Sequence, residues 1–139
     1  MKILAYVVYI IVFTYCYYFL NRKLPNKWIF ILYPLIFAVA IIPIKFWVDY
    51  ARPTYGDAFA SSWLKIILMM FASLCVFNIA YGFVNILVNT QVGFHQTYGS
   101  ANSNPLKRII DNASNIKGAL HLFFYTGGVI LMGIAITKY

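Results

Sequence analysis

The chain has 139 residues, of which 63% are hydrophobic and 10% are charged, and its formal net charge is +8. A soluble domain carries charge on about a quarter of its residues, so this composition excludes an ordinary water-soluble surface and predicts an integral membrane protein. The basic residues stand singly or in small groups between apolar runs. A nucleic-acid-binding protein would gather them on one face, so we expect a lipid bilayer and no nucleic acid as the partner of this surface.

Four apolar runs are long enough to cross a bilayer, which takes roughly 17–25 residues per helix. They predict spans at about residues 3–20, 28–47, 66–88 and 118–137. Backbone polar groups in lipid must be paired within the segment, so each span is expected to be an α-helix. Short connections favour opposite directions for neighbouring helices. The predicted fold is therefore all-α: a polytopic membrane protein with one domain, residues 1–139, and four transmembrane helices in an antiparallel bundle.

The first two predicted spans carry further signals. Tyr15, Tyr17 and Tyr18 come just before a basic turn, where amphipathic rings are expected to anchor the helix end at headgroup depth. Pro34 and Pro43 lie inside the second span and predict a kink.

The connection after the second span concentrates charge and aromatic character. Asp49, Arg52, Tyr55 and Asp57 stand there among turn-forming residues. Loops of this composition are common at partner contacts, so these four residues are a candidate contact surface. Alternatively, Arg52 pairs with Asp49 or Asp57 and only shapes the turn.

The third span holds the most distinctive pattern. Cys75, Asn78, Gly82, Asn85 and Asn89 recur at alternating three- and four-residue spacing, which places them on one helix face. Asparagine is unfavourable in hydrocarbon unless its amide is paired, so this face is expected to point at protein or water. It either packs against a neighbouring helix or lines a water-filled path for a small solute or ion. The absence of an ionisable group in the face favours packing.

A long connection precedes the fourth span. Its first part, residues 91–103, is polar and neutral and is predicted to be a loop. Asn104 and Pro105 then resemble the start of a helix, and apolar residues recur at helical spacing up to residue 117. This segment is predicted to be a short amphipathic helix at the membrane interface before the last span. An extension of the fourth helix is the alternative.

The fourth span carries small residues on one face, Thr126, Gly133 and Thr137. Small residues allow close helix contact in membranes. This face is predicted to pack within the chain, or else against another subunit.

Chemistry-bearing residues are sparse. His95 and His121 are weak candidates for a paired-imidazole haem or metal site, and ordinary interfacial histidines are the default expectation. No metal-ligand spacing, phosphate loop or paired carboxylates occur in the sequence. We therefore expect no catalytic residues, no cofactor, no metal and no enzymatic activity.

The expected function is to bind another membrane protein by helix–helix contact, or to self-associate. Asn78, Gly82 and Asn85 are expected to make the intramembrane contacts with the partner, and residues 52–57 a surface contact. The chain would be an accessory subunit of a membrane complex or an immunity-type protein against a membrane-inserting toxin. A bacterial inner membrane is the expected location. The main alternative is a small homo-oligomeric channel or transporter lined by the third span, and a haem-bearing membrane anchor is a more remote one.

Overall fold

The structure is a computed structural model, and it describes residues 2–98 and 104–139. All of the regular elements in these ranges are helices. They are α1 (Lys2–Thr14), the π-helix η1 (Tyr15–Leu20), α2 (Asn21–Lys23), α3 (Asn26–Tyr55), α4 (Asp57–Tyr98), α5 (Asn104–Asp111) and α6 (Ala113–Lys138). The end of the predicted loop, residues 99–103, lies outside the described residues.

Four helical segments are long and apolar enough to cross a membrane: Lys2–Lys23, Asn26–Tyr55, Asp57–Thr97 and Ala113–Lys138. Each predicted span lies inside one of them. The all-helical architecture with four such helices is therefore confirmed.

Two predicted loops are wrong over most of their length. Residues 49–55 belong to α3, and only Gly56, with a φ of 90°, separates α3 from α4. Residues 91–98 continue α4. The physical reason is that hydropathy marks where a helix leaves lipid, whereas the helical hydrogen bonds continue into the polar residues beyond.

The short helix before the last span exists as α5, but it ends at Asp111, earlier than predicted. Residues 113–117 are the first five residues of α6. Asn112 joins the two helices, and its backbone N–H donates to the carbonyl of Arg108 over 3.1 Å. The segment thus contains both a separate short helix and an N-terminal extension of the last predicted span.

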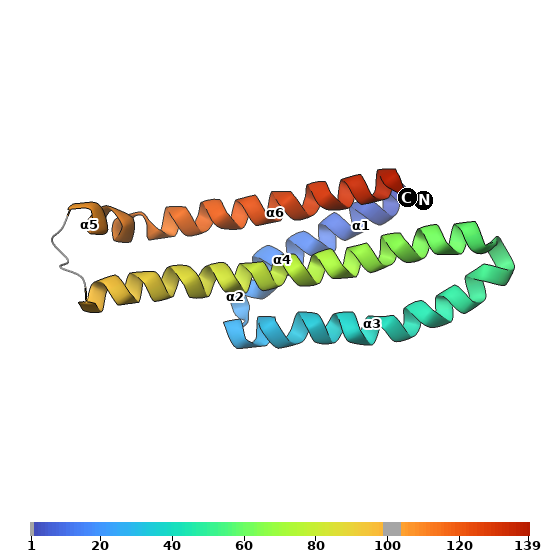
Figure 1. The fold of residues 1–139 in the computed structure, drawn as a ribbon, viewed down its shortest axis with the longest axis horizontal. Coiled ribbons are helices and arrows are strands. Elements are labelled where there is room, and N and C mark those ends of the chain that lie inside the picture. Colours follow the sequence, from blue (N-terminus) through green and yellow to red (C-terminus); the bar gives the residue numbers. More distant parts are fainter. Residues whose placement is uncertain (1, 99–103) are drawn as a thin grey trace.

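The long helices lie lengthwise along the molecule, and α4 has a central position (Figure 1). It contacts both α3 and α6, while α1 packs on α6. The start of α1 and the end of α6 lie beside each other, short of the α3–α4 corner, and α3 bends along its length (Figure 1). Near these termini the Tyr6 hydroxyl donates to the carbonyl of Val129 over 3.0 Å and fastens α1 to α6.

The core is rich in aromatic rings contributed by the first helical segment. Tyr9, Phe13, Tyr17 and Asn21 are each at most 3% exposed, and they follow one another at intervals of four residues. Phe13 stacks on Tyr125 of α6 with ring centroids 5.4 Å apart. Tyr17, which was expected to face the membrane interface, has its ring fully buried among the other helices.

The π-helix explains how a four-residue repeat stays on one face. In an α-helix, four residues rotate about 40° beyond one full turn, so such a repeat drifts around the helix. Turns of a π-helix contain more residues, and η1 lies between Phe13 and Asn21. It reduces the drift and keeps Tyr17 and Asn21 facing the core.

Candidate functional site

Asn78 of α4 occupies the centre of a buried chain of hydrogen bonds. The Asn21 side-chain NH₂ donates to Oδ1 of Asn78 over 2.6 Å, and the Tyr33 hydroxyl donates to Oδ1 of Asn21 over 2.7 Å. Nδ2 of Asn78 donates to the carbonyl of Leu74 over 2.7 Å. The three linked side chains are at most 2% exposed. The chain therefore ties α2, α3 and α4 together and pairs the buried amides, as an apolar environment requires.

Asn85, two turns further along α4, joins a second polar cluster. Its Oδ1 lies 3.2 Å from Nε2 of His121, and its Nδ2 donates to Oδ1 of Asn26 over 3.4 Å. Because an amide oxygen only accepts, this contact assigns a proton to Nε2. The imidazole also stacks on Tyr81, with ring centroids 4.1 Å apart. Tyr17 fixes the backbone beneath it by donating to the His121 carbonyl over 3.0 Å.

A polar cleft of about 660 Å³ opens beside this cluster. Arg22 and Asn26 line it from the corner between η1 and α3, Asn89 lines it from α4, and Ser114 and Lys117 line it from α6. The Asn85 and His121 side chains also face it. Two of the lining residues are cationic and none is acidic. The arrangement offers hydrogen-bond donors and positive charge, and can therefore hold an anionic group.

The polar face predicted on the third span is divided between these environments. Asn78, Gly82 and Asn85 are buried within the chain, whereas Asn89 is exposed at the cleft. Cys75 is half-buried against the aromatic core. The amides of Asn78 and Asn85 thus hydrogen-bond to other segments of the same chain and are not presented to a partner.

Gly82 lies where α3 and α4 approach closely. A Cβ built there would come within 3.3 Å of the Phe30 ring and 3.4 Å of Ile29. This is the close helix contact expected of a small residue in a membrane helix.

The small-residue face predicted on the fourth span does not act as a unit. Thr126 and Thr137 are exposed, and the Thr137 hydroxyl donates to its own helix at Ile134. Gly133 packs against Tyr6: a Cβ built on Gly133 would lie 3.1 Å from the Tyr6 hydroxyl oxygen. The tighter contact on α6 is at Gly128, where a built Cβ would lie 2.7 Å from the Phe13 ring.

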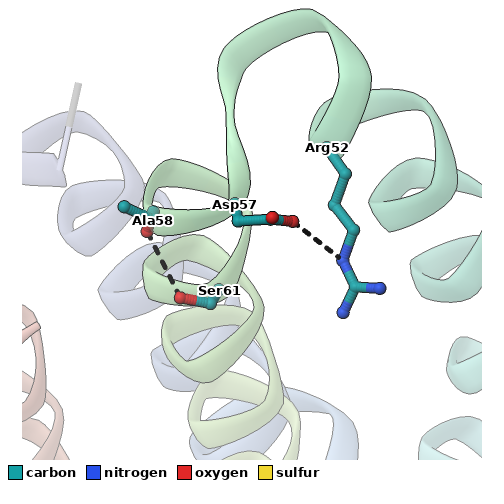
Figure 2. A network of polar contacts seen from close by, with 4 residues as sticks. All are labelled: Arg52, Asp57, Ala58 and Ser61. Atoms are coloured by element: carbon teal, nitrogen blue, oxygen red, sulfur yellow. Dashed lines mark hydrogen bonds and ion pairs between the residues drawn. The ribbon is translucent and has the colours of Figure 1, made fainter.

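The candidate contact residues near the second connection lie on helix ends. Arg52 Nε and Asp57 Oδ1 are 3.8 Å apart across Gly56, and their side chains are 57% and 92% exposed. Figure 2 shows this pair beside the first turn of α4. The interpretation that Arg52 pairs with Asp57 is thus the one observed. Asp49 and Tyr55 are exposed on α3, and Tyr55 packs its ring against Phe59 with centroids 5.3 Å apart.

The two histidines are not brought together. His121 contacts Asn85, and His95 lies ten residues further along the same helix α4. That separation corresponds to about 15 Å of helix rise, and the two imidazoles line different clefts. They therefore cannot ligate one haem iron or metal ion in this arrangement.

Asn21 and Tyr33 are central to the buried polar chain, and sequence reasoning missed both. Asn21 precedes two basic residues and resembles a turn, and Tyr33 stands in a uniformly apolar run. The available signal was the four-residue repeat of Tyr9, Phe13, Tyr17 and Asn21. A polar residue at the end of a buried aromatic stripe requires a polar partner, which α4 supplies.

Comparisons of the chain with protein-family models, curated proteins and solved structures find no match.

Proposed function

We propose that this chain is a multi-pass membrane protein without enzymatic activity that binds another membrane protein. In this proposal its four long helices cross the bilayer in alternating directions, and α5 lies at the interface. It would serve as an accessory subunit of a membrane complex or as an immunity-type protein that occupies a membrane-inserting toxin. The observation that supports this proposal is the one-sided packing of α3.

The buried residues of α3 form a single stripe along 30 residues of helix: Ile29, Tyr33, Ala40, Val48 and Ala51. This stripe faces α4, the helix against which α3 packs. The remaining surface of α3 is apolar and exposed, as it is at Val39, which is 56% exposed, and Phe46, which is 72% exposed. Most of the circumference of α3 is thus open to lipid or to another helix.

Two prolines indicate that the open surface of α3 contacts a partner helix and not only lipid. Pro34 and Pro43 are exposed on α3, and proline has no N–H to donate to the carbonyl four residues earlier. The carbonyls of Phe30 and Val39 therefore lose their α-helical donors. Lipid tails cannot replace these donors, whereas hydroxyl or amide side chains of a neighbouring helix can. This favours a partner helix carrying Ser, Thr, Asn or Gln along α3.

Site-specific photocrosslinking in cells that contain the protein tests the proposal. A crosslinking amino acid is placed at Val39, Ile42 or Phe46 on the open surface of α3, with Ile130 and Ile134 of α6 as equally exposed controls. The expected result is one and the same membrane protein captured from the α3 positions and not from α6. Capture of a second copy of this chain would establish the self-associating form.

Crosslinking to lipid alone from all five positions would refute the proposal. A flux assay on purified protein in liposomes distinguishes the channel alternative. Solute or ion flux that disappears in Asn78→Leu and Asn85→Leu, at unchanged protein content, would replace the binding function with transport.

A further inference from the structure

The cleft between the η1–α3 corner, α4 and α6 contains donors that the rest of the chain does not use. In the described residues, no protein acceptor pairs with the side chains of Arg22, Asn89, Ser114 or Lys117. Asn26 accepts from Asn85 through its oxygen, which leaves its NH₂ group for another acceptor. Five side chains can therefore donate into one space of about 660 Å³.

The charged side chains that line the cleft are all positive. The chain contains three acidic residues, and none of them lines the cleft. Asp49 and Asp57 belong to the α3–α4 corner, at the other end of α3 from Asn26, and Asp111 lies in the separate helix α5. Arg22 and Lys117 are thus left without a carboxylate among the described residues, and their potential attracts an anion.

His121 borders the cleft but does not itself add a donor for an anion. The residue is 9% exposed and its ring lines the cleft. Nε2 is paired with Asn85, whereas Nδ1 is buried and has no hydrogen-bond partner in the part of the chain that the structure describes. With the proton on Nε2, Nδ1 is an acceptor, and a buried acceptor is satisfied by a donor such as a water or a hydroxyl group, not by an anion. The case for an anion therefore depends on the five donors and the two cationic side chains of the cleft.

The position of the cleft narrows the choice of anion. The corner that contains Arg22 and Asn26 joins two candidate membrane spans. In the membrane arrangement proposed above, on which this inference rests, the cleft lies at the depth of the lipid headgroups. Arginine and lysine with amide and hydroxyl donors are the side chains that bind phosphate oxygens. We infer that this cleft is a binding site for a phosphate group, supplied either by the headgroup of an anionic phospholipid or by a soluble phosphate.

Neighbouring basic residues provide a matched control. Lys23 follows Arg22 directly in the sequence and is exposed, but it does not line the cleft. Lys23→Gln therefore removes the same charge from the same corner without touching the site. Neither Arg22 nor Lys117 is part of the buried core, so Arg22→Gln and Lys117→Gln are expected to fold.

The experiment measures binding to the purified protein in a phosphate-free detergent by native mass spectrometry with added phosphatidylglycerol, and by calorimetry with inorganic phosphate. We expect one saturable site whose Kd rises about tenfold in Arg22→Gln and in Lys117→Gln, since each loses a charge-assisted hydrogen bond. In Lys23→Gln the Kd should change by less than about twofold. Arg22→Lys should retain part of the affinity.

The lipid and the inorganic phosphate measurements together identify which molecule supplies the phosphate group. Saturable binding of the lipid alone assigns the site to a headgroup, and saturable binding of inorganic phosphate assigns it to a soluble phosphate. The inference is overturned if neither probe binds saturably, or if Lys23→Gln weakens binding as much as the two cleft substitutions do.

Discussion

Replacing Asn78 with leucine tests whether the buried hydrogen bonds hold the helices together. The change removes the acceptor of the Asn21 side-chain NH₂, which lies 2.6 Å away in a residue that is 2% exposed. The Leu74 carbonyl retains the backbone N–H of residue 78 as its α-helical donor, so one orphaned group remains. An unpaired buried donor costs about 1–3 kcal/mol. We expect Asn78→Leu to lower the free energy of unfolding by about 2 kcal/mol.

The double variant Asn21→Leu/Asn78→Leu makes the prediction specific. Asn21→Leu alone removes the acceptor of the Tyr33 hydroxyl, which also contacts Cys16, and the donor to the Asn78 oxygen. It should cost about 2 kcal/mol or more. Removing both amides leaves only the Tyr33 hydroxyl without its partner. The double variant should therefore be more stable than the sum of the single effects predicts, by about 1–2 kcal/mol.

Equilibrium unfolding in mixed micelles with increasing SDS, followed by tryptophan fluorescence, measures these free energies. Asn89→Leu is the matched control, because Asn89 is exposed on the same helix, and it should change stability by less than about 0.5 kcal/mol. The reasoning is refuted if Asn78→Leu is as stable as the parent protein, or if the effects of the two single substitutions simply add.

Two further predictions concern α6 and the α3–α4 corner. Gly128→Ala should lower the midpoint of thermal unfolding, because the added Cβ would lie 2.7 Å from the fully buried ring of Phe13 and overpacking costs typically about 1–3 kcal/mol. Gly127→Ala, whose Cβ would meet a ring at an ordinary 3.5 Å, should leave the midpoint unchanged or raise it, and equal losses in both would count against the contact. Asp57→Asn breaks the pair with Arg52 but should change the unfolding free energy in micelles by less than about 1 kcal/mol, since both side chains are largely exposed; a larger loss would show that this corner is held by more than an exposed ion pair.

The four helices that are long and apolar enough to cross a membrane could be predicted because a long uncharged run has one stable form in lipid. The ends of these helices could not be predicted. Residues 91–98 carry no sustained apolar period and include Gly93, which weakens a helix, yet α4 continues through them. At the α3–α4 corner, Pro53 and Gly56 suggested a loop, yet Pro53 is accommodated in the last turn of α3 and only Gly56 leaves the helix.

Only the α4 residues of the candidate site were predicted from the sequence. The spacing of Asn78 and Asn85 identified the inward face of α4, because unpaired amides are excluded from lipid. Their partners Asn21, Asn26 and His121 come from three other segments. Periodicity within one segment carries no information on which other segment it meets. The cleft itself depends on how the η1–α3 corner approaches α6, which is a property of packing.

The π-helix compensates for one residue of extra length in the first segment. In continuous α-helix, the eight residues from Phe13 to Asn21 would turn about 80° beyond two full turns. The wider turns of η1 remove most of that excess, and Asn21 therefore reaches Asn78. Substitutions that convert Tyr15–Leu20 into α-helix at unchanged length would rotate Asn21 away from its partner and Arg22 away from the cleft. Deleting one residue together with the wide turn leaves seven residues, about 20° short of two turns, and would keep both side chains close to their present directions.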